Sequence, residues 1–145
     1  MYYLKKIRKE RIMNNKTIGN NFEAELCEKL SEYGFWVHSL AMNKAGQPAD
    51  IIAVKDKKAY LIDAKVCSNR GFALSRMEEN QELAMTLWSE RGNGQGWFAL
   101  QVPTGEIYMI PHFCIQAYKG RQASLSFNEI HELGKPLGKW VERCR

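Results

Sequence analysis

Apolar residues recur at the spacing of one helix face in two segments of the chain. In residues 19–33 the apolar positions are Phe22, Leu26, Leu30 and Tyr33. Glutamate and lysine side chains fall on the opposite side. This segment is therefore predicted to form an amphipathic helix that ends near Gly34.

The second segment covers residues 75–91. Ser75 and Glu78 have the spacing of a capping box, which predicts that a helix begins at Ser75. The apolar stripe continues through Met77, Ala84 and Trp88. A helix is therefore expected from Ser75 toward Arg91, followed by a glycine-rich connector at residues 92–96.

Short runs rich in β-branched and aromatic residues alternate with polar turns in the rest of the chain, as expected for strands. The predicted strands cover residues 35–40, 51–54, 59–66, 97–102 and 106–110, and residues 111–118 are predicted to form a short helix. This order predicts an α/β fold in which a mixed sheet is flanked by helices. At 145 residues the chain suits a single domain. We place that domain at residues 19–145, after a basic N-terminal arm of residues 1–18.

Basic residues outnumber acidic ones by 21 to 16, which gives a formal net charge of +5 and favours a polyanionic partner. Many of them crowd the two ends of the chain. The terminal basic residues are Lys5, Lys6, Arg8, Lys9 and Arg11, with Lys135, Lys139, Arg143 and Arg145 at the other end. Both groups are candidate phosphate contacts, although a basic terminus is equally compatible with a solvated tail.

The four cysteines are widely separated and form no zinc-binding pattern, as expected for a protein of a reducing compartment. No apolar run is long enough for a membrane helix, and the basic N-terminus leads into polar residues where a signal peptide would need an apolar stretch. We therefore expect a cytoplasmic protein that does not associate with membranes.

The second and third predicted strands bring two acids together if they form a hairpin with a two-residue loop at residues 56–57. With Lys55 paired to Lys58, Asp50 lies opposite Asp63. Carboxylates in this arrangement lie about 5 Å apart and repel each other unless a cation lies between them. Two oxygen ligands at that spacing suit Mg²⁺.

Three further polar side chains are expected near these acids. Lys65 shares the sheet face of Asp63, because side chains alternate along a strand. Glu23 falls within the apolar arc of the first helix, where a carboxylate needs a donor or a cation. Gln81 falls within that of the second helix, although it also fits a satisfied core amide. The two helices are thus expected to direct polar groups toward one face of the sheet.

Each acidic residue also has an ordinary structural explanation. Asp63 and Lys65 fit an exposed charged strand edge, and Asp50 fits a loop residue. Glu23 fits the third position of a capping box with Asn20. The whole set at this spacing favours a metal-dependent active site over these separate explanations.

Two segments resemble the PD-(D/E)XK signature of the restriction-endonuclease-like superfamily. They are Pro48-Ala49-Asp50, with Ala49 inserted in the Pro-Asp pair, and Asp63-Ala64-Lys65, which follows after twelve residues. In addition, the segment from Gly19 to Glu23 resembles the start of the first helix in Holliday junction resolvases of that superfamily. The resemblance implies a restriction-endonuclease-like fold and a metal-dependent endodeoxyribonuclease.

The likeness is greatest to RecU-type resolvases, in which a strand ending in acid-Ala-Lys precedes a Phe-x-Leu segment and a helix with a glutamine. Here these are Asp63-Ala64-Lys65, Phe72-Ala73-Leu74 and Gln81. RecU-type proteins carry a long stalk insertion between the first two strands, whereas this chain has only the loop at residues 41–48. The resemblance implies a homodimer that nicks four-way DNA junctions symmetrically during recombination and repair.

The resemblance also implies roles for the candidate residues. The oxygen ligands for one or two Mg²⁺ ions, for which Mn²⁺ can substitute, are Glu23, Asp50, Asp63 and the Ala64 carbonyl. Lys65 positions the attacking water or stabilises developing negative charge, and Gln81 orients the water or that lysine. The products implied are a 5′-phosphate and a 3′-hydroxyl.

Two alternatives stay open at this point. The first is a less selective or flap-type endonuclease of the same fold, because the stalk is absent. The second is a catalytically inactive DNA-binding or assembly protein, which the intact set of acids and lysine disfavours. A small-molecule enzyme lacks any cofactor motif in this sequence.

Overall fold

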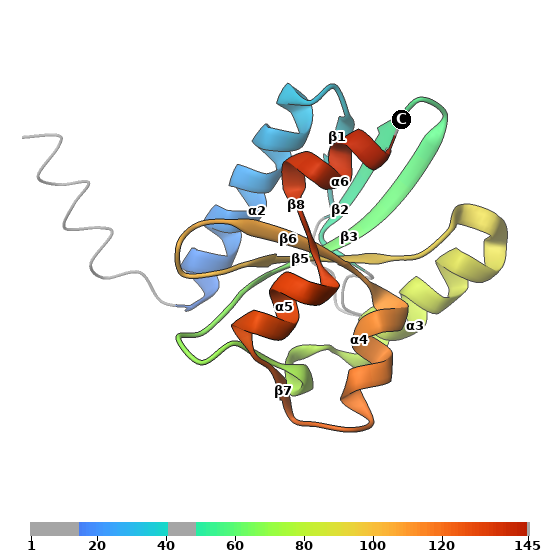
Figure 1. Cartoon of the computed structure of the whole chain (residues 1–145). Helices are drawn as coiled ribbons and strands as arrows, with labels where there is room; N and C mark the ends of the chain where they lie inside the picture. Colours follow the sequence, from blue (N-terminus) through green and yellow to red (C-terminus); the bar gives the residue numbers. More distant parts are fainter. Residues whose placement is uncertain (1–14, 41–48, 145) are drawn as a thin grey trace, which may run out of the picture.

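A mixed six-stranded sheet organises the computed structural model, which describes residues 15–40 and 49–144 (Figure 1). The strands lie in the order β1-β2-β3-β5-β6-β8. They are β1 (Trp36–Ser39), β2 (Ile51–Lys55), β3 (Lys58–Val66), β5 (Trp97–Gln101), β6 (Ile107–Pro111) and β8 (Lys135–Pro136). Only the central pair, β3 and β5, is parallel among these neighbours. The predicted α/β fold with a mixed sheet is confirmed.

Helices cover both faces of this sheet (Figure 1). One face packs against α2 (Asn15–Glu32) and α6 (Leu137–Arg143), and the other against α3 (Glu79–Trp88), α4 (His112–Lys119) and α5 (Phe127–Leu133). Strand side chains alternate between the two faces, so each face has its own apolar core. No helix within residues 15–40 or 49–144 is long and apolar enough to cross a membrane.

The apolar stripe predicted for the first helix is the face of α2 that packs on the sheet. Phe22, Leu26 and Leu30 are almost fully buried against the sheet, beside Trp140 of α6. The helix begins at Asn15, earlier than predicted, and residues 1–14 of the basic arm lie outside the described residues.

The predicted capping box at Ser75 is wrong. Residues Leu74–Arg76 form a short 3-10 turn, and α3 begins at Glu79 without a side-chain cap. The reason is that Leu74 and Met77 are both buried, and a repeat of three residues matches a 3-10 turn better than an α-helix. A capping box does occur in the C-terminal region, where Ser126 and Glu129 cap α5 reciprocally.

The predicted β2–β3 hairpin is confirmed in its register and its loop. Lys55 pairs with Lys58 and Ile51 pairs with Ile62. Asp56 and Lys57 have φ angles of 50° and 66°, as a two-residue type I′ turn requires. This turn matches the twist of the strands and sets which residues of β3 face each helix layer.

Gly71 is a position where the backbone tolerates only glycine. It precedes the small ribbon of β4 (Phe72–Ala73) and β7 (Ser124–Leu125), and its φ is +119°. A Cβ atom at Gly71 would lie 2.1 Å from the Leu125 carbonyl oxygen. The chain after β3 therefore approaches β7 too closely for any side chain.

Gly71→Ala is expected to lower the free energy of unfolding by about 2–4 kcal/mol, through the steric overlap and the strained φ. Urea denaturation followed by circular dichroism measures this change. The matched control is Gly120→Ala, which meets nothing within 4 Å and should stay within about 0.5 kcal/mol of wild type. Equal stabilities for the two variants would contradict the prediction.

Candidate active site

Asp50 lies immediately before β2, at the point where the hairpin leaves its regular register. If the register continued, Asp50 would pair with Asp63. The Asp50 N–H donates instead to the Ile62 carbonyl, at 3.1 Å. Its side chain accepts a hydrogen bond at Oδ2 from the Ala64 N–H at 2.7 Å. Asp50 is 7% exposed, and its carboxylate takes the place of a main-chain carbonyl as acceptor in the strand ladder.

Asp63 lies on the sheet face that packs against α3 and is fully buried. Its Oδ1 accepts a hydrogen bond from Gln81 Nε2 at 3.0 Å. Its Oδ2 lies 3.3 Å from Lys65 Nζ but accepts no hydrogen bond within the described residues. Gln81 and Lys65, both predicted to lie near this acid, thus contact opposite oxygens of one carboxylate.

The electrostatics of this pair disfavour two negative charges. Burial raises the pKa of Asp63 well above its ordinary value, and the nearby Asp50 carboxylate raises it further. Lys65 acts in the opposite direction but does not offset the burial. Without another cation, the site favours a proton on Asp63.

Glu23 approaches these acids from the other layer of helices. It is half-buried on α2, and the Ser39 hydroxyl of β1 donates to its Oε1 at 2.7 Å. Burial raises the pKa of Glu23, the Ser39 hydrogen bond lowers it, and Asp50 raises it again. Glu23 is therefore close enough to Asp50 for their charges to interact.

The structure rules out one alternative explanation of Glu23 and corrects one expectation about it. A capping box with Asn20 is excluded, because α2 begins at Asn15 and Glu23 lies in its interior. The helices α2 and α3 also flank opposite faces of the sheet, so Glu23 and Gln81 do not point at one face. Gln81 contacts Asp63 from the α3 side, whereas Glu23 lies near Asp50 and comes from α2. Sequence reasoning missed Ser39, whose only signal is its position at the end of the strand beside Asp50.

The donor set suits a divalent cation, although its members are not drawn into a finished cage. Within residues 15–40 and 49–144, no group of three His, Cys, Asp or Glu side chains is placed to hold a metal. The fit rests instead on two adjacent buried carboxylates and on the Asp63 Oδ2 atom, which lacks a hydrogen bond. Carboxylate oxygens are the protein ligands that Mg²⁺ prefers, and a cation would remove their repulsion.

The protein has the restriction-endonuclease-like architecture. Its mixed sheet is flanked by α2 and α3, and the β2–β3 hairpin carries Asp50 and the Asp63-Ala64-Lys65 triplet. The chain belongs more narrowly to the archaeal Holliday junction resolvase (Hjc) family, whose model matches residues 14–133. It is therefore a structure-selective DNA endonuclease that cleaves Holliday junctions in recombination. Nucleases of this family depend on a metal.

The structural comparison agrees with this assignment. A structure of Hjc, a Holliday junction resolvase from the archaeal hyperthermophile Archaeoglobus fulgidus, superposes with a TM-score of 0.66. It covers 85% of this chain and 99% of that chain at 16% sequence identity, which shows a shared fold. No curated protein sequence matches this chain.

The expected RecU-type membership is corrected by these findings. The superfamily and the resolvase class are right, but the family is Hjc. The short loop at residues 41–48, which lies outside the described residues, was the feature that departed from RecU.

Asp63→Asn is expected to stabilise the metal-free protein at neutral pH. Above pH ~3.9, the ordinary aspartate pKa, the unfolded chain releases a proton that buried Asp63 retains. Wild-type stability therefore falls as pH rises from there through the raised pKa of the folded state. Asparagine is neutral, accepts from Gln81 and donates to Asp50, so the variant avoids this loss.

Urea titrations in EDTA across acid to neutral pH test this prediction. The stability advantage of Asp63→Asn should be greatest at neutral pH and disappear in acid, where Asp63 is protonated in both states. A wild type that equals or exceeds the variant at neutral pH would show that Asp63 carries no destabilising charge.

Proposed function

We propose that Asp50 and Asp63, with the Ala64 carbonyl and Glu23, hold one or two Mg²⁺ ions at which this resolvase hydrolyses a junction phosphodiester. Mn²⁺ is expected to substitute. The observation that carries the proposal is the buried Asp63 carboxylate, placed beside Asp50 with one oxygen lacking a hydrogen bond. Such a group is costly unless a cation or a proton neutralises it.

In the proposed reaction, a water oxygen attacks phosphorus and the bond to the 3′-oxygen breaks. The products are a 5′-phosphate and a 3′-hydroxyl, and the proton lost by the water is balanced by the proton gained by the leaving oxygen. When bound, the metal supplies positive charge that lowers the pKa of water and offsets charge on the phosphate.

Lys65 is proposed to act on the phosphate or the attacking water. The Lys65 side chain is 14% exposed and its ammonium lies 3.3 Å from Asp63 Oδ2, so the charge is held at the edge of the buried pair. From there it offsets the negative charge that develops on the phosphate oxygens. Its proximity to Asp63 keeps the cation in place before substrate binds.

Gln81 is proposed to be a positioning residue. Its Nε2 holds Asp63 Oδ1 at 3.0 Å, and its own Oε1 has no hydrogen-bond partner within the described residues. The hydrogen bond leaves Oδ2 as the oxygen that faces Lys65. Ser39 supports Glu23 in the same manner from β1.

Lys65→Ala is expected to lower the single-turnover rate of four-way junction cleavage in Mg²⁺ by about 10²–10³-fold, because a charge that stabilises the transition state is lost. Junction binding in EDTA should change little. Rapid-quench cleavage of a labelled junction measures the rate, and an electrophoretic shift measures binding.

The control for Lys65→Ala is Arg121→Ala, which removes an exposed basic side chain just after α4 and should cleave at the wild-type rate. Wild-type cleavage by Lys65→Ala would remove Lys65 from the proposed chemistry. Parallel assays on flap, duplex and single-stranded DNA establish how strongly this chain prefers junctions.

We also propose that the active form is a homodimer, because two symmetric nicks across a four-way junction need two active centres. The outer face of α3 supports this arrangement. Leu83 and Leu87 lie one turn apart on that face and are 59% and 42% exposed, and Phe113 of the adjacent α4 is 55% exposed. Glu82 joins the two helices through an ion pair with Lys119, and its other carboxylate oxygen lies 3.6 Å from His112 Nε2. A second copy would bury these apolar side chains.

Replacing Leu83 and Leu87 together by aspartate is expected to convert the dimer to a monomer, since two charges per subunit would be desolvated at a symmetric interface. Sedimentation velocity at micromolar protein measures the change. Ile18→Asp, at a 37% exposed apolar position on α2, is the control and should stay dimeric. A monomeric wild type, or a dimeric Leu83/Leu87 variant, would contradict the proposed interface.

The basic arm is proposed to add phosphate contacts beyond the active site. Residues 1–14 of the arm, which carry five of its six basic side chains, lie outside the described residues.

The four cysteines are free thiols, which supports our expectation of a reducing, cytoplasmic setting.

A further inference from the structure

A groove of about 440 Å³ lies away from the acids, beside the hairpin turn at which β3 begins. Its walls come from the β2–β3 turn, from the loop after η2 (Ser89–Asn93) and from α6. Its floor includes Trp97 and Trp140, which belong to the core between the sheet and α2. Asp63 lies five residues after Lys58 on β3, and its side chain is on the sheet face opposite to α2. The groove is therefore separate from the proposed active site.

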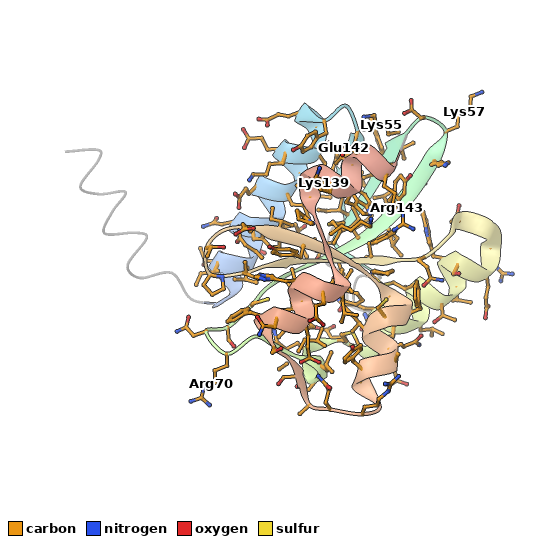
Figure 2. The ribbon with its side chains drawn as sticks, viewed as in Figure 1. Lys55, Lys57, Arg70, Lys139, Glu142 and Arg143 are labelled. Atoms are coloured by element: carbon orange, nitrogen blue, oxygen red, sulfur yellow. The ribbon has the colours of Figure 1, made fainter. Side chains whose placement is uncertain are left out.

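The charged residues that line this groove are all basic. They are Lys57, Lys58 and Arg143, and no aspartate or glutamate joins them in the lining. None of the three makes an ion pair within the described residues, whereas Lys139 on α6 pairs with Glu142 at 3.9 Å. In Figure 2, Arg143 extends from α6 toward the space between the hairpin and η2, and Lys57 extends from the hairpin tip.

Arg143 is also oriented by its surroundings. Its guanidinium carbon lies 5.9 Å from the centre of the Trp97 ring, which holds a planar cation at the groove floor. Burial raises the pKa of the neighbouring Cys144 thiol, while the Tyr60 hydrogen bond and the charges of Arg143, Lys55 and Lys58 lower it. The positive charges of three elements therefore act on one place in the groove.

The opposite wall contains two glycines with open space where a side chain would be. Gly92 and Gly94 have φ angles of 88° and 80°, and a Cβ at either position would meet nothing within 4 Å. Gly92 follows helical residues, and a right-handed to left-handed succession turns neighbouring N–H groups toward one concave side that suits an anion. Asn93 adds a side-chain amide to the same wall, as does Gln95, whose Nε2 also donates to the Ser89 hydroxyl at 3.5 Å.

We propose that this groove binds a backbone phosphate of a DNA arm that leads away from the scissile phosphate. The proposal rests on the junction-cleaving activity of the family. The unpaired cations, the amide donors and the lack of acids match a phosphodiester, and the groove opens toward solvent as a continuing strand requires.

The separation from the active site sets a minimum arm length. Lys58 and Asp63 are five residues apart on β3, which is roughly 17 Å at the rise of a strand. At ~3.4 Å per base pair, an arm has to extend about five base pairs beyond the cleavage point to reach the groove.

The test measures binding of a fluorescein-labelled four-way junction in EDTA by anisotropy over a series of salt concentrations. Arg143→Gln is expected to reduce the slope of log Kd against log salt by about 1, the value for one lost phosphate contact. Lys57→Asn with Lys58→Gln should reduce it by about 1–2, and asparagine preserves the left-handed turn at residue 57. Arg143→Lys should retain most of the slope, because the charge remains.

Arg121→Gln is the matched control, since it removes one exposed arginine that lies outside the groove and makes no ion pair within the described residues, and it should keep the wild-type slope. A junction with neutral methylphosphonate linkages about five base pairs from the cleavage point should erase the difference between wild type and Arg143→Gln. Wild-type slopes for both groove variants, or an equal reduction in Arg121→Gln, would overturn the proposed contact.

Two further outcomes distinguish the DNA contact from a free-nucleotide site and from the nuclease assignment. Quenching of tryptophan fluorescence by the mononucleotide dTMP, together with unchanged slopes for the groove variants, would identify a free-nucleotide site and overturn the DNA contact. Failure of the wild type to cleave junctions in Mg²⁺ would overturn the nuclease assignment instead, and the binding slopes would still decide the groove.

Discussion

The repulsion between Asp50 and Asp63 is the constraint around which the site is arranged. Burial alone already disfavours a charged Asp63, and the second carboxylate adds to that cost. Each contact around the pair restrains one oxygen: Ala64 donates to Asp50, Gln81 donates to Asp63, and Lys65 lies beside the remaining Asp63 oxygen. The fold thus keeps two acids in a place that favours a cation or a proton, at a cost in the stability of the metal-free protein.

The surrounding structure serves mainly to hold this pair in register. The tight turn at Asp56 and Lys57 determines which residues of β3 face α3, and a slip of one residue would turn Asp63 toward α2. The parallel pairing of β3 with β5 places the acid in the centre of the sheet, where water is excluded. Gln81 reaches it because Met85, one turn later, anchors α3 in the core.

Much of this arrangement was predictable from the sequence, because it depends on local pattern. Alternation and turn chemistry gave the hairpin register, and a carboxylate in an apolar helical arc identified Glu23 as unusual. The errors came from tertiary packing. Because Leu74 and Met77 are both buried, a 3-10 turn forms where a helix start at Ser75 was expected. The helices α2 and α3 pack on opposite faces of the sheet, which no local pattern shows. The contact between Ser39 and Glu23 joins distant segments that no local period connects.

Whether the carboxyl pair binds a metal can be measured by calorimetric titration of Mg²⁺ into the metal-free protein, repeated at neutral pH in buffers of different ionisation enthalpy. If Asp50 and Asp63 bind the ion, wild type should bind Mg²⁺ and release protons from the carboxyl pair, and Asp63→Asn should lose both the binding and the proton release. Mg²⁺ binding with the same affinity and proton release in Asp63→Asn would contradict the account, as would a wild type that binds no Mg²⁺.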